Sequence, residues 1–183
     1  MIDSAINQLA ALLNQYLKRT FDLNEDIVIA SNILEQDGSL AQNINNKMIV
    51  FLVNIQKDNE AFRPDVNAVG LSRSVVSYPP VHLNLFVMFA ANFNGNNYPE
   101  ALKFISNTIG FFQRRPVFDR QNTPELDVNI EKLVLDMESL NFNDLSNLWS
   151  VLSGKYMPSV LYKIRMVTID AADVKEQVSM IRE

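Results

Sequence analysis

The chain has 183 residues, of which 48% are hydrophobic and 20% are charged, with a formal net charge of −5 and a pI near 4.9. This length is enough for one domain with a buried core. The acidic balance makes phosphate backbones and anionic lipids poor partners, so we expect no binding to nucleic acid and none to membrane. Cysteine is absent, which excludes disulfides and thiol chemistry and is consistent with a reducing cytoplasm.

The first segment predicts an amphipathic helix of about five turns. Apolar residues recur at helical spacing from Ile2 to Leu17, and Asp3 and Ser4 are candidate caps at its start. The segment has an acidic residue where a signal peptide needs positive charge, and its apolar residues are spaced rather than continuous. We therefore interpret it as part of the fold.

Three strands are predicted next. The run 27–33 is short and β-branched, residues 48–57 are apolar on both alternating faces up to Asn54, and residues 82–91 repeat that pattern. Strands that are apolar on both faces are typical of a sheet covered on both sides. The segment 58–80 exceeds the length of an ordinary loop, so we expect it to be mobile or functional.

A second helix is predicted from residue 98 to the region before Pro116. Asn97 precedes it as a candidate N-cap, and Glu100 stands at the position of a capping box. Gly110, in the helix interior, costs up to ~1 kcal/mol relative to alanine, so we expect a packing reason for it.

The last predicted elements are a strand, a short helix and a strand. Residues 129–140 alternate between apolar and charged side chains, as in a half-exposed strand. A short helix beginning near Asn143 places Trp149 on the side that must face the sheet. Gly154 is a candidate for its C-terminal cap, and Pro158 prevents the helix from continuing into the final strand.

The order of these elements, α, β, β, β, α, β, α, β, predicts an α+β fold with one mixed β-sheet and helices packed on it. We expect a single domain that spans residues 1–183. The C-terminal segment 170–183 has weak helical spacing and is expected to be a docking or flexible tail.

Residues suited to catalysis are scarce. The single histidine, His82, begins an apolar strand, where a structural role is more common than a catalytic one. Four acidic residues are candidates for a carboxylate pair, although a solvated strand face explains them better: Asp127, Glu131, Asp136 and Glu138. No EF-hand, HExxH, glycine-rich phosphate loop or GxSxG pattern occurs. We therefore predict no catalytic residues, no cofactor, no metal ligands and no enzyme activity.

The candidate interaction residues are arginines. Arg114 and Arg115 follow the second helix and Arg120 is close by, which makes a basic island in an acidic chain. Cations at a helix C-terminus complement the macrodipole, and arginine is also favoured at interfaces, so the sequence leaves both interpretations open. Arg63 and Arg73, in the long segment, are further candidates for contact with a neighbour.

Two blocks of the sequence resemble a known family. They read LNLFVMFAANFNGNNYPEALKFISNTIGFFQ (83–113) and LDMESLNFNDLSNLWSVLSGKYMPSVLYKIRMVTID (135–170), and the opening MIDSAINQLAALLNQYLKRTF is also similar. The family is that of the tail-terminator (tube-capping) proteins of phage-tail-like extracellular contractile injection systems, of the antifeeding-prophage and virulence-cassette type. Ser153 stands where the family pattern has glycine, and some members run well beyond the end of this chain.

The resemblance implies a structural cap. Such a subunit forms a homo-oligomeric ring, expected to be a hexamer, that closes the distal end of the inner tube, engages the last sheath layer and fixes particle length. The implied partners are the inner-tube protein and the sheath protein. The implied location is the cytoplasm during assembly, and then a particle that is released or anchored. One alternative is an assembly adaptor or chaperone that the particle does not retain. Another is a small enzyme with a carboxylate-based site at Asp136 or Glu138.

Overall fold

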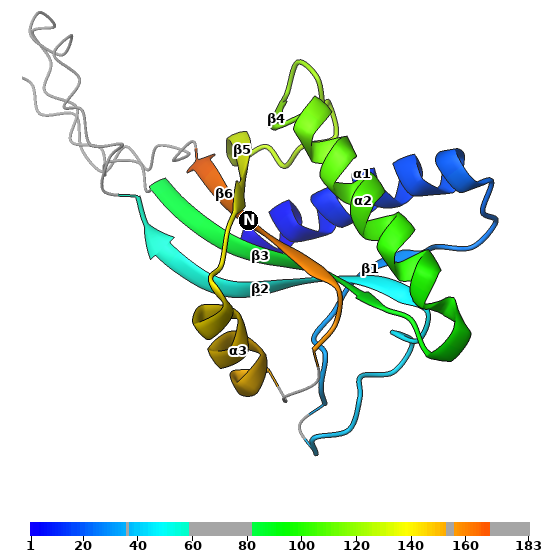
Figure 1. The fold of residues 1–183 in the computed structure, drawn as a ribbon. Coiled ribbons are helices and arrows are strands. Elements are labelled where there is room, and N and C mark those ends of the chain that lie inside the picture. The colour runs from blue at the N-terminus through cyan, green and yellow to red at the C-terminus, as the bar shows by residue number, and fades with distance from the viewer. Residues whose placement is uncertain (36, 59–81, 153–155, 169–183) are drawn as a thin grey trace, which may run out of the picture.

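A computed structural model describes residues 1–35, 37–58, 82–152 and 156–168. The strands of this part of the chain are β1 (Val28–Ala30), β2 (Lys47–Lys57), β3 (His82–Asn92), β4 (Val117–Asp119), β5 (Ile130–Glu138) and β6 (Ser159–Thr168). They form one six-stranded sheet in the order β1-β2-β3-β6-β5-β4 (Figure 1). Only the β1–β2 pair is parallel; the other neighbours are antiparallel.

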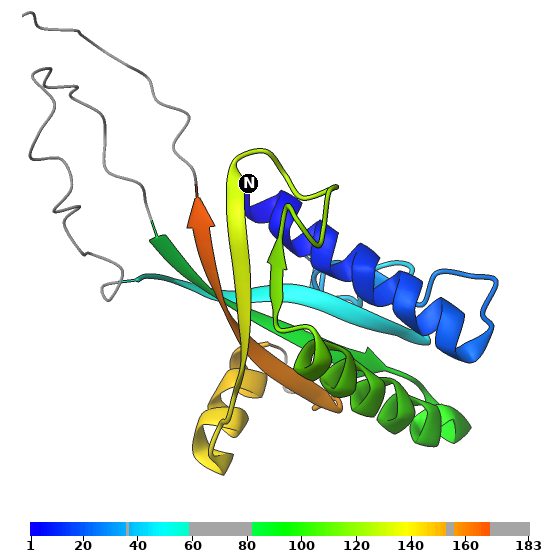
Figure 2. The ribbon, with the colours of Figure 1, turned by 90° about the horizontal axis from the view of Figure 1, so that it is seen from above.

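The helices cover the two faces of this sheet unequally. The long helices α1 (Ile2–Phe21) and α2 (Tyr98–Arg114) lie on one face, and the short α3 (Phe142–Val151) lies on the other (Figures 1 and 2). A 3-10 turn, η2 (Gly95–Asn97), leads from β3 into α2. This arrangement of helices on one mixed sheet confirms the predicted α+β fold.

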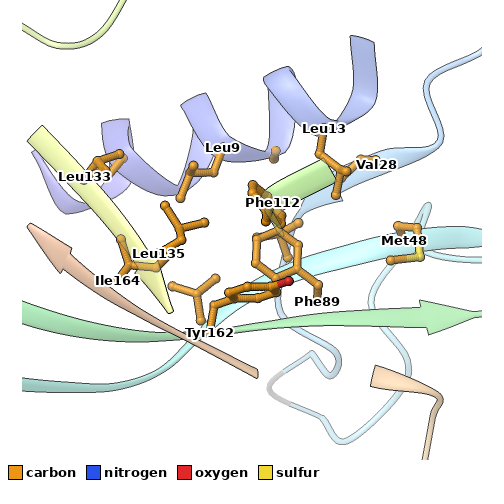
Figure 3. Packing of buried hydrophobic residues seen from close by; sticks show 14 of the residues in the cluster. Leu9, Leu13, Val28, Met48, Phe89, Phe112, Leu133, Leu135, Tyr162 and Ile164 are labelled. Atoms are coloured by element: carbon orange, nitrogen blue, oxygen red, sulfur yellow. The ribbon is translucent and has the colours of Figure 1, made fainter. Parts of the chain in front are cut away.

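The larger core lies between the sheet and the helices α1 and α2. Its centre is a group of three rings from three elements, Phe89 of β3, Phe112 of α2 and Tyr162 of β6 (Figure 3). The ring centroids are 4.9 Å apart for Phe89–Phe112, 5.1 Å for Phe112–Tyr162 and 5.6 Å for Phe89–Tyr162. Leu9 and Leu13, from the predicted apolar stripe of α1, are fully buried against this core. Each aromatic pair adds about 0.5–1.5 kcal/mol beyond the burial of its area.

A smaller core covers part of the opposite face. Trp149 of α3 is 3% exposed and belongs to a cluster with Met88 and Leu161. The prediction that Trp149 faces the sheet is therefore confirmed. The prediction that β3 is buried on both faces is also confirmed, because Phe89 and Met88, which are adjacent along the strand, belong to opposite cores.

The strand predicted at 27–33 is much shorter than expected. Only Val28–Ala30 pair with β2, and the N–H of Ser31 donates the last bond, to the Val50 carbonyl at 3.1 Å. The strand is held to α1 by Asn14, whose Oδ1 accepts the backbone N–H of Val28 at 3.1 Å. The prediction from apolar β-branched residues alone therefore overestimated the length of this strand. The strand ends where its pairing with β2 ends, and local propensity does not determine that point.

The predicted helix caps were correct in position for α2 and wrong for α1. Asp3 and Ser4 lie in the first turn of α1 and accept hydrogen bonds from the amino group of Met1, which occupies the N-cap position. Asn97 occupies the N-cap position of α2 but its side chain makes no capping bond, and no capping box with Glu100 forms. Residue 154, residues 59–80 of the long segment and the tail 170–183 lie outside the described residues.

Packing does not explain the glycine inside α2. A Cβ built on Gly110 meets only Nη1 of Arg114, at the ordinary contact distance of 3.6 Å. The expected packing reason is therefore wrong, and the position accepts a methyl group.

We predict that Gly110→Ala raises the free energy of unfolding by about 0.5–1 kcal/mol, because alanine loses less conformational freedom in a helix. Urea denaturation monitored by circular dichroism measures the change. Lys103→Ala in the same helix is the control and should change the stability by less than about 0.5 kcal/mol, since its ion pair with Glu100 is exposed. A destabilised Gly110→Ala protein would contradict the prediction.

Burial raises the pKa of Tyr162 to about 12. Because the folded state keeps this phenol neutral while the unfolded chain ionises it near pH ~10, the folded protein retains its stability below that pH. As the pH rises toward 12 the free energy of unfolding should fall by about 2 kcal/mol. The midpoint of urea unfolding, measured across this pH range, tests the predicted fall in stability. A Tyr162→Phe protein that loses as much stability over the same range would refute the assignment to Tyr162.

Candidate interaction surfaces

The side chain of Arg115 links the C-terminal end of α2 to the loop after β4. It is half-buried, and its guanidinium carbon lies 4.9 Å from the centroid of the Phe118 ring. The same guanidinium donates to Oγ1 of Thr123 at 2.8 Å and to Oδ1 of Asn122 at 3.1 Å. These contacts show that Arg115 stabilises a loop of its own chain.

Arg114 and Arg120 are exposed and contact other parts of the fold. Arg114 donates to the hydroxyl of Tyr16 at 2.6 Å, and the Tyr16 ring stacks on Phe111 with centroids 4.8 Å apart. Arg120 donates to the backbone carbonyl of Val128. Across the described part of the chain, neither arginine forms an ion pair with a carboxylate. Their positive charge therefore remains available to an acidic group from outside.

The structure groups the candidate arginines only in part. Arg115 and Arg120 hold the same loop, 120–129, whereas Arg114 lies over α1. Arg63 and Arg73 lie outside the described residues. The role of all five arginines at an interface stays a prediction.

The candidate carboxylates do not converge. Asp127 lies near the start of α1, where the hydroxyl of Ser4 and the backbone N–H of Asn129 lower its pKa. The other three are exposed along β5: Glu131, Asp136 and Glu138. Within the described ranges, no three His, Asp or Glu side chains lie close enough to hold a metal ion.

One ion pair was not predicted from the sequence. Asp58, just after β2, has its side chain only 3% exposed, and its Oδ2 lies 3.2 Å from Nε of Arg165 on β6. The N–H of Asp58 donates to the carbonyl of His82 at 2.9 Å. Finding this pair requires the register of β2, β3 and β6, which no local pattern supplies.

A second unpredicted feature is a pair of adjoining hollows at the α3 end of the sheet, and we call the aromatic and leucine side chains that line them the aromatic strip. It consists of Phe142, Leu145, Trp149, Tyr156, Tyr98 and Leu40. A hollow of about 300 Å³ under α3 and one of about 250 Å³ beside the start of α2 adjoin at Tyr156, which lines both. The Tyr156 ring meets the Trp149 ring edge-on, with centroids 5.7 Å apart. Among the described residues that line the two hollows, none is charged.

The part of the chain that the structure describes contains no helix long and apolar enough to cross a membrane.

The same fold occurs in two solved structures, both determined by cryo-electron microscopy. One is the sheath/tube terminator, in its extended state, of the extracellular contractile injection system PVC, with a TM-score of 0.61 and 18% identity. The other is the tube terminating cap of the anti-feeding prophage, with a TM-score of 0.55 and 15% identity. Both matches cover 100% of this chain, which spans 61% of the first structure and 59% of the second. At these identities the likeness shows that the chain shares its fold with both proteins.

Residues 4–183 match the family model described as the Pvc16 N-terminal domain, and the chain belongs to this family. The family resemblance carried by the two sequence blocks is thereby confirmed. A search of curated protein sequences found no match.

We predict that Arg115→Ala lowers the free energy of unfolding by about 1–3 kcal/mol, because it removes the ring contact and several hydrogen bonds of a charged group. The matched variant Arg114→Ala removes one exposed hydrogen bond to Tyr16 and a longer contact, of 5.5 Å, with the Tyr16 ring, and should cost about 0.5–1 kcal/mol. Urea denaturation of both proteins gives the comparison. Equal losses of stability in the two variants would mean that Arg115 does not stabilise the loop more than Arg114 does.

Proposed function

We propose that the protein is a structural terminator of a contractile injection particle. It caps the distal end of the inner tube and the last layer of the sheath, and so fixes the length of the particle. The observation that supports this most directly is the match of the whole chain to a sheath/tube terminator and to a tube terminating cap. Both of those proteins are components of particles, so we do not favour a transient adaptor.

The proposed partners are further copies of the chain, the inner-tube protein and the sheath protein. A ring of copies, proposed to be a hexamer, needs two different surfaces on each subunit that close on one another. Arg114 and Arg120 carry exposed positive charge without a partner carboxylate among the described residues, and we propose that they contact acidic groups of a neighbour. Arg63, Arg73 and the tail 170–183 are proposed as further contacts.

Terminating a tube is a geometric task that needs no reacting group. The subunit must present fixed surfaces, which the two-sided core of the sheet supplies. We accordingly propose that the protein has no enzyme activity and that it assembles in the cytoplasm before it joins the particle.

Deleting the gene in a producing strain tests the proposal through the length distribution of the particles in electron micrographs. We expect long, irregular tubes or particles that lack a closed end, because nothing then stops growth. Particles of normal, uniform length with normal ends would overturn the terminator function.

Complementation of the deletion provides the controls. The unaltered gene should restore the length distribution. The double variant Arg114→Glu, Arg120→Glu should restore it poorly if these arginines meet acidic groups. Lys103→Glu reverses a charge elsewhere on α2, where Lys103 already pairs with Glu100 at 3.6 Å, and should complement normally.

A further inference from the structure

The turn between β3 and α2 contains the only Asn-Gly pair in the sequence, Asn94–Gly95. In such a pair the backbone nitrogen of the glycine can attack the side-chain carbonyl carbon of the asparagine, because the glycine has no Cβ to hinder the approach. In a folded protein the attack depends on how firmly the surroundings hold these two groups.

Neither reacting group of the pair is held by a hydrogen bond. Asn94 is exposed, and its side-chain amide makes no hydrogen bond with any residue that the structure describes. Within the same described ranges, the N–H of Gly95 has no acceptor. By contrast, the amide of Asn92 is buried and donates to the carbonyl of Ile44 at 3.0 Å.

The backbone must turn before the two groups can meet. Asn94 is extended, with φ −94° and ψ 147°, and this ψ places the Gly95 nitrogen away from the side chain. Rotation about ψ breaks the bond in which the Asn94 carbonyl accepts the N–H of Asn97 at 3.2 Å. One exposed hydrogen bond is a small restraint. Gly95 has φ 58°, and a Cβ built on it would meet no atom of the described residues within 4 Å, so the turn has room to rotate.

The only Asp-Gly pair in the sequence, Asp37–Gly38, is protected by comparison. The N–H of Gly38 donates to the carbonyl of Glu35 at 3.0 Å, so its nitrogen is engaged. The hydroxyl and the backbone N–H of Ser39 donate to Oδ1 of Asp37, at 2.6 and 2.9 Å, and lower the pKa of this carboxyl. An ionised carboxylate resists attack by a nucleophile, so this pair is an internal control.

We propose that Asn94 is a site of spontaneous deamidation. The Gly95 nitrogen loses its proton to a base in solution and forms a bond to Cγ of Asn94, and the side-chain nitrogen takes up a proton and leaves as ammonia. Water then opens the succinimide ring at either carbonyl, which gives aspartate or isoaspartate. The net reaction consumes one water and releases one ammonia. The inference does not depend on the proposed function.

The two products affect α2 differently. Aspartate at this position precedes η2 and the first turn of α2, where a negative charge is favourable to the helix dipole. Isoaspartate lengthens the backbone by one carbon, so the bond between the Asn97 N–H and the Asn94 carbonyl cannot keep its geometry. We therefore expect isoaspartate to weaken the start of α2, the helix that supplies Phe112 to the larger core.

Peptide mapping by mass spectrometry, on the purified chain incubated at several pH values above neutral, tests the proposal. We expect the peptide that contains Asn94 to acquire the mass of the deamidated form, and to do so faster at higher pH, because the nitrogen must lose its proton. The opening of one exposed hydrogen bond should slow the reaction by no more than about tenfold relative to the chain unfolded in guanidinium chloride. Asn92 and Asp37 should stay unchanged in the folded chain.

Asn94→Gln is the matched control. It keeps the amide, but ring closure from the longer side chain is much slower, so this variant should stay unmodified over the same time. It should also fold normally, because the Asn94 side chain is exposed. Asn94→Asp separates the two products, since it has the new charge without the longer backbone. The aged protein should therefore unfold at a lower urea concentration than Asn94→Asp.

An unmodified Asn94 in the folded chain, or a reaction more than about tenfold slower than in the unfolded chain, would overturn the proposal. Equal deamidation of Asn92 in the folded chain would also overturn it, because the local geometry would then not select the site. An aged protein as stable as Asn94→Asp would refute the effect assigned to isoaspartate. Each of these results leaves the terminator function standing, since deletion of the gene tests that function separately.

Discussion

The burial of β3 on both faces is the constraint on which the rest of the structure depends. Leu85, Val87 and Phe89 point to one side and Met88 and Ala90 to the other, and all five are at most 1% exposed. Such a strand is stable only when both faces are covered. The helices α1 and α2 cover one face as a continuous layer, and α3 with the loop before β2 covers part of the other. The unequal cover leaves the α3 end of the sheet with exposed aromatic residues.

The elements that the sequence predicted best are those whose burial is periodic. The apolar stripe of α1 and the doubly apolar run of β3 predict their positions well, because long periodic patterns determine which face is buried. The edges were predicted less well: β1 ends where its pairing with β2 ends. The N-cap position of α2 was predicted correctly at Asn97, whereas the capping hydrogen bonds were not predicted, because a cap depends on the geometry of one hydrogen bond, which composition does not determine.

The sequence identified the candidate arginines as a group but did not predict how they are arranged. The spacing of Arg114, Arg115 and Arg120 revealed a basic island, whereas their actual contacts depend on distant parts of the chain. Tyr16, which accepts the bond of Arg114, is 98 residues away in the sequence. The aromatic strip was missed for the same reason: Leu40 and Tyr98 join Phe142 on one surface only after the sheet has formed.

The bond between Asp58 and His82 has a consequence for the evolution of the chain. It joins the residues on either side of the segment 59–81, and the ion pair of Asp58 with Arg165 ties that point to β6 as well. The sheet therefore fixes both ends of the segment whatever lies between them. Doubling the length of a loop with fixed ends costs only about 0.6 kcal/mol of closure entropy. Closure entropy therefore opposes a longer connection between β2 and β3 only weakly, and lineages of the family can differ in length at this point.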